Sequence, residues 1–321
     1  MKSRLRAYAS FLLAPLVLLA LHAAGDPVAL ARRAAPSGAG NIFTTSSGTT
    51  LWYEVRGGGP GVHRPPLIVV NGGPGFDHTY MLASDVWDRL SAQRPVVLYD
   101  QRGTGRSGAL KAGEPCTLAD EVADLEALRA RLGVEKFDLL GHSWGGYLSM
   151  AYAIRHPERV QHLVLCDAAA PRFADTVFLL RALHPEAMER RDRLDALALL
   201  GDRAAGEESL REVMNMLFLS PKKREEFLAA SGTYQFSHAV NQAIEAEIAR
   251  HDLGPALSQL KIPALVLTGR YDANIAPETA WKLHKLLPGS RFVVFEQSGH
   301  LPFVEEPEGF QRAVESFLNA N

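Results

Sequence analysis

The stretch Gly141–Gly146, GHSWGG, decides the fold of this 321-residue chain. It follows the apolar run Lys136–Leu140, which is typical of a buried strand, and it opens a helix-forming segment, Trp144–Ile154. The pattern is G-x-S-x-G between a strand and a helix, where the flanking glycines allow a turn sharp enough to expose the serine hydroxyl. The sequence therefore predicts a nucleophile, Ser143, at a helix N-terminus, where aligned peptide dipoles favour developing negative charge.

The same short apolar pattern recurs along the chain and alternates with segments of helical periodicity. This alternation predicts a mostly parallel sheet with helices on both faces, an α/β fold. The predicted strands are Ile42–Thr45, Leu51–Val55, Leu67–Val70, Pro95–Tyr99, Lys136–Leu140, Val160–Cys166, Ala264–Thr268 and Arg291–Phe295. The predicted helices are Met81–Leu90, Leu118–Leu132, Trp144–Ile154, Glu278–Leu287 and Pro307–Leu318.

One long segment breaks the alternation. Residues 171–255 have a helical pattern without a convincing strand, which predicts a helical cap inserted into the sheet domain. The sheet domain is then divided into residues 42–170 and 256–321, because the motifs that carry chemistry lie on both sides of the cap.

The N-terminus has the order of a secretory signal peptide. Basic residues precede an apolar run, Phe11–Leu21, and small residues follow at 23–25. Residues 1–23 are therefore predicted to be removed on export, and residues 24–41, rich in Ala, Gly, Pro and Ser, to form a flexible leader. The apolar run is shorter than the ~20 residues of a membrane span, which argues against the alternative, an uncleaved N-terminal anchor. We expect a periplasmic or secreted protein.

Composition excludes several classes of function. The chain is 47% hydrophobic and 22% charged with a net charge of -2, which is ordinary for a globular protein and gives no reason to expect nucleic-acid binding. Two cysteines, Cys116 and Cys166, cannot form a disulfide framework or a four-cysteine zinc site, and we expect both as free thiols. The histidines lack metal-ligand spacing, so neither a metal nor a cofactor is predicted.

One glycine motif resembles that of a nucleotide site, but it is not followed directly by a helix as such a site requires. Gly103–Gly108 fits G-x-G-x-x-G, which in a dinucleotide site should open a helix directly. Here Lys111–Pro115, with a glycine and a proline, comes between the motif and the next helix. We interpret the motif as a loop at the rim of the site.

A serine needs a base and an orienting acid to become a good nucleophile. Asp272 follows the predicted strand Ala264–Thr268, and His300 follows Arg291–Phe295, so both come just after strands and in the order serine, acid, histidine. His300 is predicted to take the Ser143 proton, and Asp272 to fix the histidine tautomer and stabilise the imidazolium. His142, beside the nucleophile, is interpreted as structural.

Acyl transfer also needs donors for the oxyanion. The segment Asn71–Gly75, NGGPG, follows the strand Leu67–Val70, and its glycines let backbone N–H groups approach a ligand. We predict that the oxyanion hole consists of the N–H groups of Gly73 and Trp144.

Together these segments resemble the α/β-hydrolase fold and, within it, the proline iminopeptidase family of serine aminopeptidases. The resemblance spans roughly Leu51–Phe317 apart from the cap. It implies an eight-stranded sheet, the same triad and oxyanion donors, and a small-molecule or short-peptide substrate whose N-terminal residue is released through an acyl-enzyme. Its motifs are NGGPG at 71–75, DQRGTGRS at 100–107, GHSWGG at 141–146, GRYD at 269–272 and SGH at 298–300.

Two features depart from the family's pattern. Asn71 stands where the family usually has histidine. The family also holds the substrate's α-amine with cap glutamates, and its glutamate-containing motif is not found here. Glu245 and Glu247 are candidates, but at positions i and i+2 of one helix they cannot both point inward. Three further candidates are Glu207, Glu208 and Glu212.

Three functions stay open on the sequence. The first is an exported aminopeptidase that removes N-terminal proline or another small apolar residue. The second is an esterase or amidase that uses the same triad on a small acyl substrate. The third is a non-catalytic binding protein, against which the complete set Ser143, Asp272 and His300 argues.

Overall fold

The computed structural model describes residues 40–320 except 59–62 and 231–235. The predicted signal peptide, residues 1–23, and nearly all of the predicted leader lie outside the described residues. Within the described part of the chain, no helix combines the length and the apolar character that crossing a membrane requires.

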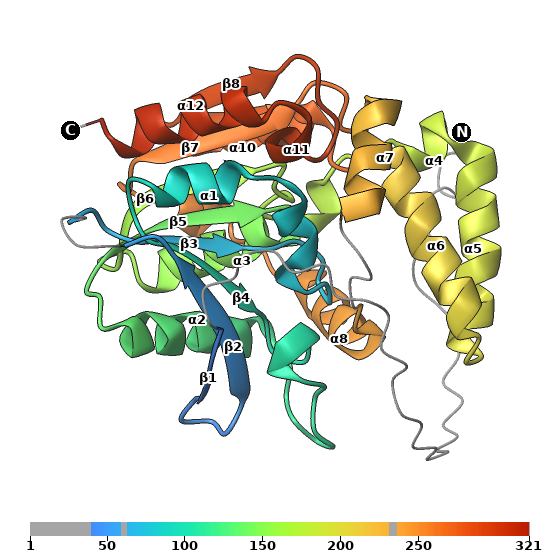
Figure 1. Ribbon diagram of the computed structural model, residues 1–321, viewed down its shortest axis with the longest axis horizontal. Coiled ribbons are helices and arrows are strands. Elements are labelled where there is room, and N and C mark those ends of the chain that lie inside the picture. The colour runs from blue at the N-terminus through green and yellow to red at the C-terminus, as the bar shows by residue number, and fades with distance from the viewer. Residues whose placement is uncertain (1–39, 59–62, 231–235, 321) are drawn as a thin grey trace, which may run out of the picture. The chain divides into compact units, whose positions relative to one another are not determined.

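Eight strands form one sheet in the order β1-β2-β4-β3-β5-β6-β7-β8 (Figure 1). β1 and β2 pair antiparallel, as do β2 and β4, and the other pairs are parallel. Every residue of β3, β4, β5 and β7 is buried, which explains their uninterrupted apolar runs. The strands are β1 Asn41–Thr44, β2 Thr50–Arg56, β3 Leu67–Val70, β4 Val96–Asp100, β5 Phe137–His142, β6 Val160–Cys166, β7 Ala264–Gly269 and β8 Arg291–Phe295.

Helices cover both faces of the sheet, as predicted, and each face has its own apolar core. One core contains side chains of α2, α3, α8, α9 and α10, and the other contains side chains of α1, α7, α11 and α12. These helices are α1 Val86–Ser91, α2 Leu118–Leu132, α3 Trp144–Arg155, α7 Pro221–Ala230, α8 His238–Ile248, α9 Gly254–Leu257, α10 Pro277–Leu286, α11 Pro302–Glu305 and α12 Pro307–Leu318.

Further helices lie between β6 and β7, to one side of the sheet in Figure 1. They are α4 Leu180–Leu183, α5 Pro185–Leu199 and α6 Arg203–Met216, after a short 3-10 turn, η3 Phe173–Asp175. α5 and α6 pack against each other, yet α5 buries only Met188. A small apolar cluster joins this hairpin to the loop after β7, and it consists of Leu180, Met188, Met216 and Ala273. The cap boundaries at residues 171 and 255 stay a prediction.

The prediction of one helix over Met81–Leu90 is wrong. The structure has a 3-10 helix, η1 His78–Ala83, followed by the separate helix α1. Ser84 leaves the helical region with ψ 140°, and its hydroxyl donates to the backbone oxygen of Phe303. Apolar residues recur at helical spacing on both sides of Ser84, so the sequence pattern did not reveal the break.

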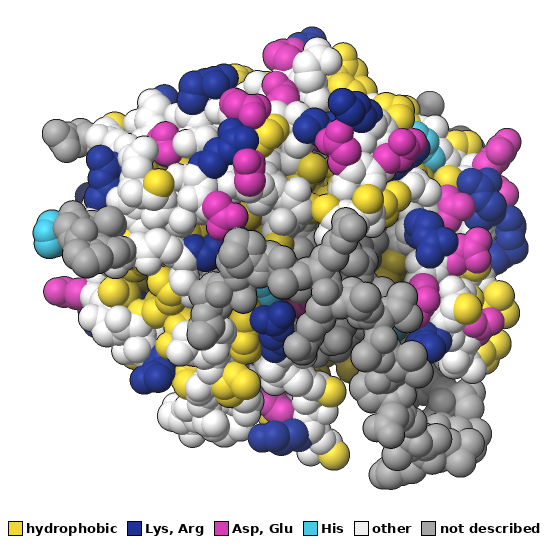
Figure 2. Space-filling view, in the orientation of Figure 1, with side chains coloured by type: hydrophobic (Ala, Val, Ile, Leu, Met, Phe, Trp, Pro, Cys, Tyr) yellow, Lys and Arg dark blue, Asp and Glu magenta, His cyan; other side chains and the backbone are white. Residues whose placement is uncertain are grey.

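Acidic and basic side chains are interspersed over the face shown in Figure 2, and neither sign forms a large field there. Exposed side chains of opposite charge form ion pairs, such as Arg181 with Asp192 at 2.9 Å and Lys282 with Glu278 at 2.7 Å. Exposed pairs of this kind contribute about 0–1 kcal/mol each, so the fold depends on its two apolar cores rather than on surface charge.

Candidate active site

Ser143 lies in the turn between β5 and α3. Its backbone has φ 57° and ψ -122°, a conformation that residues other than glycine rarely adopt and that is enriched at functional sites. The turn is held by two backbone hydrogen bonds: Ser143 N–H donates to the Cys166 oxygen at 2.9 Å, and Gly146 N–H donates to the Ser143 oxygen at 3.0 Å. The turn therefore presents the Ser143 side chain, which is 8% exposed, from a fixed backbone.

Gly145 allows the nucleophile turn to approach the end of β3. A β-carbon on Gly145 would lie 2.2 Å from the Val70 oxygen and 2.5 Å from the Asn71 oxygen, too close for any side chain. A β-carbon on Gly72 would lie 3.0 Å from the Ser143 β-carbon. The loop predicted to supply an oxyanion donor thus lies directly beside the predicted nucleophile.

Asp272 and His300, on the loops after β7 and β8, meet in a hydrogen bond. The distance from His300 Nδ1 to Asp272 Oδ2 is 2.7 Å, and both side chains are buried. Asp272 Oδ1 accepts the backbone N–H groups of Asn274 at 2.8 Å and Ile275 at 2.9 Å. A carboxylate at Nδ1 favours the tautomer whose Nε2 can accept a proton, which is the role predicted for His300.

The structure does not join His300 to Ser143 by a hydrogen bond among the described residues. His300 Nε2 instead lies 3.2 Å from Asn274 Nδ2. Without substrate, hydrogen bonds between a base and its nucleophile are often long and tighten only in the substrate complex.

His142 connects the nucleophile turn to the His300 loop. Its Nε2 lies 2.9 Å from the backbone oxygen of His300, and its Nδ1 lies 2.7 Å from Tyr80 Oη, which accepts the Gly72 N–H at 2.6 Å. Burial, and secondly the nearby His300, lowers the pKa of His142 well below its usual value. The neutral ring can therefore donate at Nε2 and accept at Nδ1, which is a structural role.

Asn71 also connects parts of the site, although the resembled family usually has histidine there. Its Nδ2 donates to the backbone oxygens of Gly72 at 2.9 Å and Phe76 at 2.8 Å, which closes the loop. Gln101 Nε2 donates to the Asn71 oxygen at 2.9 Å, while Gln101 Oε1 accepts the Trp144 indole N–H at 2.8 Å. The Asn71 and Gln101 amides thus hold the loop against the start of α3.

Gly73 and Trp144, the predicted oxyanion donors, lie in this loop and at the start of α3. Gly73 has φ 138°, in the region that favours glycine, and Trp144 is the first residue of α3. Neither backbone N–H donates to an acceptor in the described part of the chain. Both are therefore available to a negatively charged oxygen beside Ser143.

The two glutamates predicted on α8 face different partners. Glu245 Oε1 lies 3.2 Å from Asn241 Nδ2, which also contacts the backbone oxygen of Pro74 at 3.3 Å. Glu247 Oε2 accepts the Leu118 N–H at 2.8 Å and so caps the N-terminus of α2. Asn241 thus links Glu245 to the loop Asn71–Gly75, whereas Glu247 is engaged at the start of α2.

The Glu245 carboxyl group is accessible to water, although protein atoms surround much of it. The side chain is solvent-exposed, but burial among protein atoms raises the pKa of its carboxyl group above the usual value, with Asn241 and Arg191 acting in the opposite direction. Of the further candidates on α6, Glu207 and Glu208 are exposed and Glu212 is partly buried. Glu207 pairs with Arg203 at 3.7 Å, and Glu212 pairs with Arg190 at 3.2 Å.

Asp167 and Asn274 contact this site but were not singled out from the sequence. Asp167 follows β6 as Asp272 follows β7, and its side chain is fully buried. A carboxylate directly after a buried strand was the signal that could have found it. Asn274 carried no such signal, because it is one of several polar loop residues.

The loop Gly103–Gly108 is ordered around a carboxylate of its own chain. Asp100 Oδ2 accepts the Arg106 N–H at 2.7 Å, and a β-carbon on Gly105 would lie 2.5 Å from that oxygen. The loop contains only a short 3-10 turn, η2 Gly105–Ser107, and α2 begins at Leu118.

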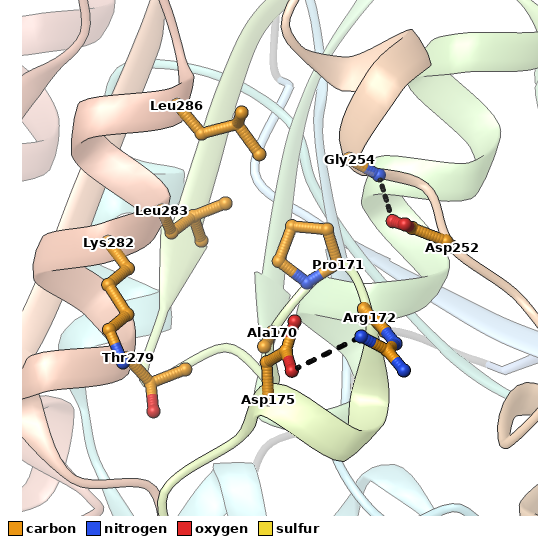
Figure 3. A pocket seen from close by; sticks show the side chains of 10 residues that line it. All are labelled: Ala170, Pro171, Arg172, Asp175, Asp252, Gly254, Thr279, Lys282, Leu283 and Leu286. Carbon is orange, nitrogen blue, oxygen red and sulfur yellow. Dashed lines mark hydrogen bonds and ion pairs between the residues drawn. The ribbon is translucent and has the colours of Figure 1, made fainter.

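The pocket in Figure 3 does not include Ser143, Asp272 or His300 among its lining residues. It has a volume of about 190 Å³ and lies between the loop after β6, α9 and α10. Pro171 and Leu283 form part of its apolar wall, and Arg172 and Asp175 form an ion pair at 3.8 Å on its rim.

A family model described as the alpha/beta hydrolase fold matches residues 65–307. The chain belongs to the α/β-hydrolase family. Curated relatives of this hydrolase include the proline iminopeptidase of Saccharolobus solfataricus, 30% identical over 79% of this chain and 84% of the relative. The proline iminopeptidase of Heyndrickxia coagulans is 29% identical over 84% of this chain and 93% of the relative. These relatives show that this hydrolase is a proline iminopeptidase-like, aminopeptidase-like enzyme.

Solved structures similar to this hydrolase include esterases. The thermophilic esterase of Thermogutta terrifontis is 27% identical, with a TM-score of 0.66 over 88% of this chain and 98% of that chain. The esterase EaEST of Exiguobacterium antarcticum, 24% identical with a TM-score of 0.67 over 87% of this chain and 99% of that chain, shows the fold alone.

Proposed function

We propose that this hydrolase is an aminopeptidase that releases an N-terminal proline or another small apolar residue through an acyl-enzyme on Ser143. The observation that carries the proposal is the 2.7 Å hydrogen bond between His300 and Asp272, on loops that border the turn of Ser143. The proline iminopeptidase relatives support the same reaction class.

In this mechanism His300 Nε2 takes the proton of Ser143 as the serine oxygen attacks the scissile carbonyl carbon. Asp272 keeps the Nδ1 proton in place and stabilises the imidazolium. The imidazolium then gives its proton to the leaving amine, the C–N bond breaks, and an ester to Ser143 forms. A water molecule, deprotonated by His300, attacks that ester. The bond between the acyl carbon and the Ser143 oxygen breaks, His300 returns the proton to that oxygen, and the amino acid is released.

The oxyanion that forms at each attack would accept the N–H groups of Gly73 and Trp144. One such donor typically contributes ~3 kcal/mol to transition-state stabilisation. The hydrogen bonds of Asn71 and Gln101 support this assignment, because they fix the two donors relative to each other.

Glu245 is the residue that we assign to the α-ammonium group of the substrate. Asn241 connects it to Pro74, next to the oxyanion donor Gly73. A hydrogen bond between an ionised carboxylate and an ammonium group contributes about 1.5–3 kcal/mol, which corresponds to a factor of about 10–100 in affinity.

The second candidate function is an esterase or amidase that does not need a free amine. The observation that favours it is that only one of the two predicted glutamates approaches the oxyanion loop. Similarity to a solved esterase at 27% identity supports it as well.

Hydrolysis of prolyl-β-naphthylamide, N-acetylprolyl-β-naphthylamide and p-nitrophenyl acetate separates the two functions, with Ser143→Ala as the blank. We expect rapid cleavage of the free-amine amide and a large loss on acetylation of the amine. Equal rates on the free and blocked amides, or activity on the ester alone, would favour the second candidate.

We also propose that the protein is exported and that residues 1–23 are removed on the way. The order of basic, apolar and small residues at the N-terminus supports this. Fractionation of cells that produce the full chain, followed by intact mass measurement, tests it. We expect a shortened protein outside the cytoplasm, whereas a full-length protein in the membrane fraction would show an uncleaved anchor.

A further inference from the structure

Asp167 is a buried ionisable residue that the proposed mechanism does not use. It follows β6 directly, its side chain is 0% exposed, and its backbone has φ 46°. Apart from Ser143, it is the one residue other than glycine with a positive φ in the described part of the chain. Asp167 thus shares a positive φ with the predicted nucleophile.

The Asp167 carboxyl group contacts the predicted triad. One polar side-chain atom from each of Asp167, Asp272 and His300 lies within 4.8 Å of the other two, which places the two carboxyl groups side by side. Two other groups complete its surroundings. The Gly269 N–H donates to Oδ1 at 2.9 Å, and the thiol of Cys166 lies 3.2 Å from Oδ2. Cys166 is free, as predicted, and so is Cys116.

Two buried carboxyl groups in contact share one proton, because both cannot be ionised without a cation. Neither carboxyl group has an ion pair with lysine or arginine among the described residues. Asp272 accepts three N–H groups, from Asn274, Ile275 and the His300 ring. Asp167 accepts one N–H group and a thiol, which is a weak donor. The negative charge is therefore better stabilised on Asp272.

We propose that Asp167 is a positioning residue of the triad: its carboxyl group is protonated and donates a hydrogen bond that holds the Asp272 carboxylate against His300. The inference rests on the proposed function, because it assigns a role through the predicted acid Asp272. It adds a residue to the site that neither the sequence motifs nor the similarity to known proteins identifies.

The electrostatic surroundings agree with this assignment. Burial is the largest cause that raises the pKa of Asp167 well above its usual value, and the charge of Asp272 acts in the same direction. The other titratable groups that face the pair are Cys166, His300 and, behind it, His142. Burial raises the pKa of the Cys166 thiol and lowers the pKa of His142, so neither supplies a charge that would ionise Asp167 at neutral pH.

The first test compares Asp167→Ala with the conservative variant Asp167→Asn, whose amide can still donate to Asp272 and accept from Gly269. The measurement is the rate at which a fluorophosphonate probe labels Ser143 as a function of pH. We expect Asp167→Ala to lower the rate about 10-fold, the effect of one lost hydrogen bond, and Asp167→Asn to recover most of that loss. The midpoint of the acidic limb should rise in Asp167→Ala, because an Asp272 carboxylate without its donor stabilises the His300 imidazolium more strongly.

The opposite results overturn the inference. If Asp167 were ionised, Asp167→Asn would remove a negative charge near His300 and lower the midpoint of the acidic limb by about one unit or more. If Asp167 had only a packing role, the asparagine and alanine variants would leave that midpoint where it is in the wild-type protein.

The second test needs neither activity nor the alanine variant. The infrared difference spectrum of wild type minus Asp167→Asn at neutral pH should contain the C=O band of a protonated carboxyl group. The band of the buried Glu121, whose pKa burial also raises, is present in both proteins and cancels. Absence of the band overturns the inference. Failure of the probe to label wild-type Ser143 at any pH would instead contradict the proposed function, so the two failures are distinguishable.

Discussion

The edge of the sheet that carries Ser143, Asp272 and His300 is packed far more tightly than the α5–α6 hairpin. Every residue of β5 and β7 is buried, whereas α5 buries one of its 15 residues. A β-carbon on Gly145 would lie 2.2 Å from a backbone oxygen, but one on Gly206 in α6 would meet only the Ala198 β-carbon at 3.4 Å. The predicted chemistry is thus fixed by close backbone contacts, which the exposed side of the hairpin lacks.

The largest expected effect in this comparison is the loss of the predicted nucleophile. Ser143→Ala should lower kcat/KM on amide and ester substrates by about 10⁴-fold or more, with the melting temperature almost unchanged. Ser149, a buried serine on the same helix whose hydroxyl has no partner among the described residues, gives the matched control Ser149→Ala. That variant should stay near wild-type activity. Residual activity above about one hundredth in Ser143→Ala would show that another group is the nucleophile.

The two glycines test the contrast in packing directly. Gly145→Ala should cost about 1–3 kcal/mol of unfolding free energy and most of the activity, because the backbone oxygens of β3 and its loop cannot move away easily. Gly206→Ala should stabilise the protein by about 0.5–1 kcal/mol, since alanine is the better helix former and has room. Urea unfolding measures both. Equal changes in unfolding free energy for the two variants would show that the sheet edge is not packed more tightly than the hairpin.

Substitutions of Glu245 and Glu247 on α8 test whether a carboxylate there binds the substrate's amine. Glu245→Gln should raise KM for prolyl-β-naphthylamide about 10–100-fold and leave hydrolysis of p-nitrophenyl acetate near the wild-type rate. Glu247→Gln is the matched control, because it changes a carboxylate that caps α2 rather than one hydrogen-bonded to Asn241. Its KM should stay within about 2-fold of wild type. An effect of the same size on the ester would contradict the assignment of Glu245 to the amine.

The smallest expected effect is a pH dependence of KM. Burial raises the pKa of Glu245, so on acidification this carboxyl group becomes neutral at a higher pH than an ordinary glutamate does. KM for the free-amine substrate should therefore rise as pH falls through that raised value, while KM for the ester stays level. Glu245→Gln should abolish the rise. A parallel rise for both substrates would point to a change elsewhere in the site.

The strands could be predicted from the sequence because strands buried on both faces are continuous apolar runs, and all eight predicted strands are confirmed within one or two residues. Asp272 and His300 could be proposed because each directly follows such a run. Asp167 could not be predicted in this way. It lies close to Asp272 because β6 pairs with β7, and no local sequence pattern indicates that pairing. Likewise, the separate roles of Glu245 and Glu247 depend on what packs against each face of α8.

The hydrogen bonds through His142 join three loops that are far apart in the sequence. The Gly72 N–H, Tyr80 Oη, the His142 ring and the His300 oxygen form one continuous chain. If any one of these hydrogen bonds breaks, a buried polar group on a neighbouring segment loses its partner. In hydrogen–deuterium exchange, the amides of these loops should consequently open as a single cooperative unit, with one common protection factor rather than three.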